Sequence, residues 1–288
     1  MKKILLCTII AVLTICGLYA QNVKFGIKGG LNLPNIMAGG NNTPVSEGYK
    51  SRLAPGWGVF TELQYNTMVS FRLGVEYSGM GGKKNGMQAM PTERLITAIG
   101  NNIGMQITEE QIIGLMTIAR VLPQYYYAEI DNTVKFDYVM IPLLTQFGWD
   151  IGQTPWRVYA NAGPFVSFFL SGIQASKGTS MMYNERGETI WSTLDQNIRD
   201  YATSEFPALA QTLSQPVTFG ENNITGEMKS ANFGPTGNIG IRYQHNRNFF
   251  FLEIGGNYGF IPVQNSDVNG SNRLGAASMM LGYAFSLF

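Results

Sequence analysis

The sequence has few of the residues on which common catalytic and metal sites depend. Its one histidine is His245, and its two cysteines, Cys7 and Cys16, both fall within the first 20 residues. The rest of the chain therefore has no thiol for a disulfide or a zinc site, and no second histidine for a metal. Hydrolases of the kind found in outer membranes rely on histidine as a base, so we predict no enzymatic activity, no metal ion and no cofactor.

Charge is also scarce and evenly balanced. Charged residues make up 14% of the chain, with 20 Lys and Arg against 19 Asp and Glu, and the mean hydropathy is −0.01. Such a chain is too apolar to be disordered, and without a second long apolar run it is too polar to be a helical membrane protein. The near-neutral charge also gives no electrostatic reason to expect a nucleic-acid partner.

A long apolar run occurs once, at the start of the sequence. Lys2 and Lys3 precede the run from Ile4 to Ala20, which predicts a secretory signal peptide over residues 1–20 and a mature chain over 21–288. A lipoprotein signal at Cys16 is disfavoured, because Ile15 stands where such signals have a small residue. The protein is thus predicted to leave the cytoplasm.

The mature chain has apolar side chains at every second position in eight separate segments. In the clearest of them Val69, Phe71, Leu73, Val75 and Tyr77 alternate with small or polar residues. This period of two predicts β-strands with one apolar face. A soluble sandwich shows the same alternation, so the pattern alone does not place the strands in a membrane.

The connections between these segments are alternately long and short. They cover about residues 34–51, 66–68, 79–133, 150–155, 172–230, 245–248 and 262–272. Short periplasmic turns and long extracellular loops give bacterial outer-membrane barrels this arrangement, with both termini in the periplasm. We therefore predict an all-β fold, an eight-stranded antiparallel transmembrane β-barrel. Trp57, Trp149 and Trp156 lie near strand ends, as aromatic residues do at membrane interfaces.

The loop insertions at about 79–133 and 172–230 are long enough to contain short helices. Thr108 and Gln111 match a capping box before an apolar pattern that ends at Pro123, and a second helical pattern precedes Pro207. The two helices either pack together as a cap over the barrel mouth or present an apolar face to a ligand or partner. The candidate binding face comprises Ile112, Ile113, Met116, Leu194, Ile198 and Tyr201.

Several charged residues share the inward-facing positions of the strands. The predicted lumen network comprises Lys24, Lys28, Glu62, Arg72, Glu76, Arg157, Arg242 and Glu253. An eight-stranded barrel has room for little more than its side chains, so these charges are expected to pair and plug the lumen. The alternative is a path for solutes or protons. The turn lengths predict that Glu62 lies opposite Arg72, and that Arg242 is a diagonal neighbour of Glu253.

Three short motifs resemble those of the PorT-like outer-membrane β-barrel family of Gram-negative bacteria. They lie at Phe25–Asn32, Tyr138–Leu144 and Leu281–Phe285. The resemblance implies an eight-stranded outer-membrane barrel, in a family of which one branch is associated with protein secretion. Met140 departs from the family pattern, which often has Glu at this position and would add a carboxylate to the lumen.

Together these features predict a non-enzymatic integral outer-membrane barrel that displays two helical loops at the cell surface. Roles as a secretion accessory, an adhesin or another binding scaffold fit this description equally. The alternative function is a narrow channel for small solutes or ions. The expected partners are outer-membrane lipids, the barrel-assembly machinery during insertion, and a surface or secretion partner whose identity the sequence does not give.

Overall fold

The computed structural model describes residues 22–38, 44–103, 108–266 and 271–287, and the side chains of all of these except 38 and 98–103. The signal peptide predicted over residues 1–20 lies outside the described residues. Within them, no helix is both long and apolar enough to cross a membrane.

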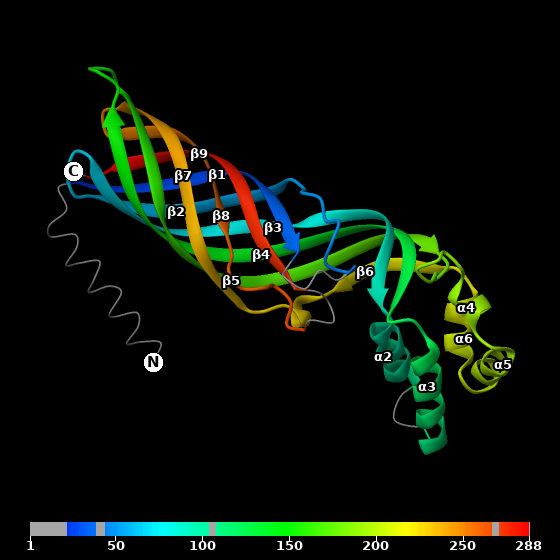
Figure 1. Cartoon of the computed structure of the whole chain (residues 1–288). Helices are drawn as coiled ribbons and strands as arrows, with labels where there is room; N and C mark the ends of the chain where they lie inside the picture. The colour runs from blue at the N-terminus through cyan, green and yellow to red at the C-terminus, as the bar shows by residue number, and fades with distance from the viewer. Residues whose placement is uncertain (1–21, 39–43, 104–107, 267–270, 288) are drawn as a thin grey trace.

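Eight antiparallel strands close into a ring, as predicted (Figure 1). They are β1 (Asn22–Ala38), β2 (Ala54–Gln64), β3 (Val69–Pro91), β4 (Tyr125–Asp150), β5 (Trp156–Ser180), β7 (Ala231–His245), β8 (Asn248–Tyr258) and β9 (Asn272–Ser286). Pairing of β1 with β9 closes the ring. A further strand, β6 (Val217–Asn223), pairs only with the outer end of β5 and lies outside the ring.

An apolar belt covers the outside of the ring. Outward side chains such as Ile239 and Leu281 are 66% and 65% exposed, whereas the inward Met280 beside Leu281 is 7% exposed. Near the short turns Trp156 packs against Tyr243 at 5.0 Å between ring centroids, and toward the other end Trp57 stacks on Tyr77 at 5.6 Å. About ten residues of strand separate the two levels, which is the length that crosses a bilayer.

Three strands continue well beyond this belt. β3, β4 and β5 have 23, 26 and 25 residues, so the loops predicted at 79–133 and 172–230 begin about ten residues too early. The reason is that the outer ends of these strands have no lipid to face. Their outward side chains are polar or charged, as at Glu129, Asp131 and Lys135, so the outward apolar alternation stops while the hydrogen-bonded ladder continues. In Figure 1 these extensions carry the helices at the end opposite the short turns.

The first long loop contains α2 (Thr92–Ile103) and α3 (Glu109–Val121). The capping box predicted at Thr108 and Gln111 is confirmed, whereas α2 was not predicted. The second loop contains α4 (Ile190–Thr193), α5 (Gln196–Glu205), α6 (Pro207–Ser214) and the short η1 (Thr225–Glu227). The helix predicted before Pro207 is present as α5, but the pattern that starts at Trp191 is interrupted after Thr193, and Pro207 starts α6 because proline suits the first turn of a helix.

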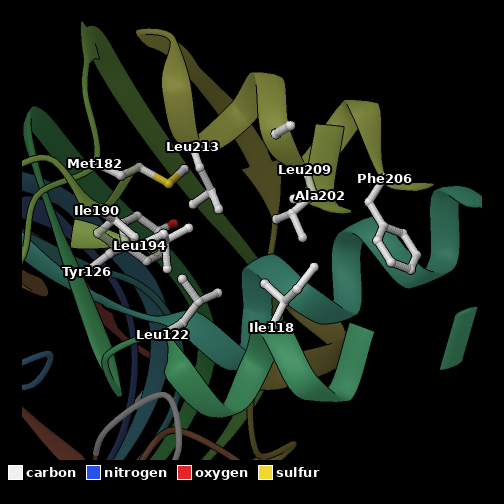
Figure 2. Packing of buried hydrophobic residues seen from close by; sticks show 11 residues of the cluster. Ile118, Leu122, Tyr126, Met182, Ile190, Leu194, Ala202, Phe206, Leu209 and Leu213 are labelled. Carbon is white, nitrogen blue, oxygen red and sulfur yellow. The ribbon is translucent and has the colours of Figure 1, made fainter. Parts of the chain in front are cut away.

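The helices share a hydrophobic core of their own. In Figure 2 Ile118 and Leu122 of α3 face the side chains of α4 to α6. Ile118, Leu209 and Leu213 are almost completely buried in this cluster. The helices therefore pack together, but they do so at the ends of the extended strands and not over the barrel mouth (Figure 1).

The belt predicts that the effect of an introduced charge on stability depends strongly on its position. Ile239→Arg puts a charge on the lipid face midway between the aromatic levels, and we expect it to lower the free energy of unfolding by about 2–4 kcal/mol. Met87 is also exposed and outward, but it lies on the extension of β3, so Met87→Arg is expected to change stability by no more than about 0.5 kcal/mol. Unfolding from phospholipid vesicles measures both, and equal tolerance would contradict the membrane placement.

Candidate functional site

The barrel lumen contains seven of the eight predicted charges as buried side chains. Those seven are Lys24, Lys28, Glu62, Arg72, Glu76, Arg242 and Glu253. Each stands at an inward position of a strand whose neighbours point to lipid, because side chains alternate along a strand. The arrangement places four cations among three carboxylates.

The carboxylates are bound by several cations at once. Glu62 accepts from Lys24 at 3.0 Å, from Arg242 at 2.6 Å and from Arg72 at 3.3 Å. Glu253 pairs with Arg72, and the Tyr159 hydroxyl also donates to it at 2.9 Å. Shared partners of this kind are what buried charges require.

A third carboxylate lies nearer the middle of the lumen. Lys28 contacts Glu76 at 2.7 Å and Glu253 at 3.8 Å. Lys28 thus joins Glu76 to Glu253, which is paired with Arg72. The seven buried charges therefore form one network that extends along the barrel axis.

The strand register agrees with the pairing sums, and further ion pairs form between strands that are not neighbours. Glu62 lies opposite Arg72, and Arg242 lies opposite Phe251. Arg242 nevertheless bonds to Glu62 on the far wall, and Glu253 bonds to Arg72 instead of its diagonal neighbour Arg242. The pairs cross the lumen because the opposite walls of so narrow a ring lie within side-chain reach.

Arg157 is the predicted member that the structure places apart. It is half-buried near the short turns, where it pairs with Asp150 at 2.8 Å and donates to the carbonyl oxygen of Thr67. Its inward position is correct, but its level is at the end of the barrel. It therefore ties two turns together and lies outside the buried network.

Aromatic rings complete the surroundings of the cations, a feature that sequence reasoning missed. The Arg72 guanidinium lies 4.3 Å from the centroid of Phe60, and the Arg242 guanidinium lies 5.1 Å from that of Tyr159. Such cation–π contacts contribute favourably where cations are desolvated. Glycine makes room for the rings, since a Cβ at Gly26 would overlap Phe60 and one at Gly240 would overlap Tyr159.

Little free space remains around this network. A cavity beside Lys28, Glu76 and Asn238 has a volume of about 20 Å³, enough for about one water molecule. Farther from the short turns an apolar layer fills the ring, and we call it the septum. It comprises Ile36, Val134, Phe136, Ile224, Met228 and Val263.

Beyond the septum the extended strands enclose a larger cavity of about 450 Å³, which we call the vestibule. The septum forms its apolar floor. Its polar wall includes Lys84, Gln88, Asn132, Gln174, Ser176 and Asn272. Residues from β1, β3, β4, β5, β6, β9, α2 and η1 meet here, so no local sequence signal pointed to it.

The described lining of the vestibule contains two cations, Lys84 and Arg94, and one carboxylate, Glu227. Arg94 pairs with Glu227 at its rim, and Lys84 donates to the carbonyl oxygen of Pro44 at 2.9 Å. Burial lowers the pKa of Lys84, although Glu47 acts in the opposite direction. Burial also raises the pKa of Tyr126, another lining residue, to about 12, so its hydroxyl stays neutral.

The candidate binding face predicted on the loops is divided by the structure. Ile112, Ile113 and Met116 are exposed together on α3, and Tyr201 is 38% exposed. Leu194 is buried, and Ile198 packs against the same cluster. The prediction that these six residues form one exposed face is therefore wrong for Leu194 and Ile198, because these two belong to the core that holds the helices together.

The remaining candidate for chemistry, His245, is exposed at the end of β7, where it flanks the turn to β8. Among the described residues no group of three or more His, Cys, Asp or Glu side chains is arranged to hold a metal ion.

A comparison of the sequence with protein families gives a result that agrees with the fold, which is a ring of strands with an apolar belt and a charged lumen. The family model for the outer membrane protein beta-barrel domain matches residues 19–265. The chain belongs to this outer-membrane β-barrel family. A comparison with curated proteins finds no match.

Solved barrel structures resemble this family member at low sequence identity. OprG of Pseudomonas aeruginosa is 10% identical, with a TM-score of 0.37 over 93% of this chain and 97% of that chain. Ail, the attachment invasion locus protein of Yersinia pestis, is 10% identical, with a TM-score of 0.32 over 91% and 98%. The outer membrane protease OmpT of Escherichia coli is 8% identical, with a TM-score of 0.43 over 93% and 97%.

The network predicts that removing one charge costs more than removing a pair. Glu62→Ala leaves Arg242 without its carboxylate, and we expect a loss of about 3–5 kcal/mol in the free energy of unfolding. Adding Arg242→Met should recover part of this loss. Asp150→Ala breaks an exposed pair and should cost about 0–1 kcal/mol. Denaturant unfolding of the barrel in detergent measures all three, and a Glu62→Ala cost no greater than that of Asp150→Ala would reject the network's role.

Proposed function

We propose that the protein is a surface-display barrel, in which a closed outer-membrane anchor holds a folded extracellular platform that binds a ligand or partner. We call the extended ends of β3, β4 and β5 with β6 and helices α2 to α6 the platform. The observation that carries the proposal is that the platform has its own hydrophobic core while the lumen below it is filled.

The proposal includes an orientation. The short turns and both termini lie in the periplasm, and the platform lies outside the cell. Support comes from the predicted signal peptide, which would deliver the N-terminus to the periplasm, and from the short connections at one end of the ring.

Two surfaces of the platform are available for binding. One is the vestibule. The other is the outer face of α3, where Ile112, Ile113 and Met116 are exposed although such side chains usually avoid water. We propose this face as the contact for a surface or secretion partner. The three motifs that resemble the PorT-like family support a secretion accessory as the specific form of this role.

The proposal assigns no enzymatic activity and disfavours a channel. A catalytic role is disfavoured because His245, the chain's one histidine, lies outside the lumen and the vestibule. A channel is disfavoured because ions would have to pass both the paired charges and the apolar septum.

The orientation can be tested by labelling, since the sequence has no cysteine after residue 20. Thr117 is exposed on α3, and Arg247 is exposed in the turn between β7 and β8. On intact cells a membrane-impermeant maleimide should label Thr117→Cys and leave Arg247→Cys unlabelled. Lysed cells should show both labelled, and the reverse pattern on intact cells would overturn the orientation.

The closed lumen can be tested by electrophysiology. Wild-type protein in planar bilayers is expected to give no steady conductance of the size of an open aqueous pore. A steady conductance that changes with Glu62→Ala would show that ions pass along the network and would favour the channel.

A further inference from the structure

We propose that the vestibule is a binding site for a neutral saccharide unit. The inference rests on the proposed function, because it names the ligand that the platform would take from outside the cell. It depends on the size of the cavity and on the chemistry of its wall.

The shape suits a small ligand and not a continuous chain. The volume of about 450 Å³ lies within the range of small-molecule sites. The septum closes the floor, and strands β3 to β6 with α2 enclose the sides. An extended peptide would need a groove open at both ends, whereas a cup of this form accepts a compact unit or the end of a glycan.

The wall is rich in carboxamides. They are Gln88, Asn132, Gln174, Asn222, Asn223, Gln264 and Asn272. Each carboxamide both donates and accepts hydrogen bonds, and so does each hydroxyl of a sugar. The Ser176 hydroxyl donates to the side-chain oxygen Oδ1 of Asn132 at 3.4 Å. This bond orients the Asn132 carboxamide within the wall.

Charge and aromatic content favour a neutral sugar over an anion. Arg94 is compensated by Glu227, and Lys84 is bonded to a carbonyl oxygen and lies 5.6 Å from the centroid of the Tyr49 ring. No cluster of free cations is therefore aimed into the cup by its described residues. The partly exposed ring of Phe219 among the lining residues offers a flat apolar face for the C–H surface of a sugar ring.

The test uses the purified full-length protein in detergent and a set of neutral and acidic oligosaccharides. We expect a neutral oligosaccharide to bind, and the double variant Asn132→Ala with Gln174→Ala to weaken that binding at least about tenfold. Asn85→Ala is the matched control, because this amide lies at an exposed position on the outer face of β3, and it should leave binding unchanged. Circular dichroism and thermal unfolding check that each variant is folded.

Several results would overturn the proposal. They are no saccharide binding by folded wild-type protein, equal binding by the double variant, preference for acidic oligosaccharides, and capture of peptides in place of saccharides. Because these measurements do not depend on orientation, their failure is separate from failure of the labelling test, which concerns the proposed function.

A second arm separates a free glycan from a lipid-linked one. A glycolipid with a neutral oligosaccharide headgroup and the same oligosaccharide released from its lipid are compared in the same assay. Equal binding of the two assigns recognition to the sugar and supports the proposal, whereas binding that requires the lipid part overturns it.

Discussion

The structure depends on one constraint, which is that a strand in hydrocarbon must have every backbone polar group bonded. Pairing of β1 with β9 meets this requirement by closing the ring. Closure at eight strands then leaves an interior of side-chain width, so any charge that alternation turns inward must find its partner on the opposite wall. The bonds from Arg72 to Glu253 and from Arg242 to Glu62 follow from that geometry, and the room for a ligand lies beyond the membrane, where the strands continue past the belt.

The membrane-spanning part of the fold was predictable because lipid and lumen differ so strongly along each strand. Val69 to Tyr77 illustrates this, with apolar side chains outside and Arg72 and Glu76 inside. The prediction ended too early at residue 79, because Lys83, Lys84 and Asn85 have no lipid to face and so show no apolar period. Register across a short turn was also predictable, as for Glu62 and Arg72, since the turn length fixes it. The cross-lumen bonds were not, because they depend on how the ring closes.

The platform was predictable only in part. The capping box at Thr108 is local and was found, but α3 has apolar residues on two faces, and a periodic pattern does not say which one is buried. Tertiary packing decides: Gly114 lets the Tyr201 ring approach closely, which turns Ile118 inward and leaves Ile113 exposed. The vestibule could not be predicted at all, since its wall is assembled from strands and loops separated by most of the chain.

The cross-lumen bonds also bear on how the barrel is assembled. They join residues about 180 positions apart in the sequence, so they form only after nearly all the strands are in place, and the chain must first accept the entropy loss of closing a very long loop. A half-curled sheet would hold Glu253 without Arg72 against it, whereas Glu62 would lack Arg242 but keep the cations of its neighbouring strands. This part of the stabilising network is therefore complete only when the ring is closed.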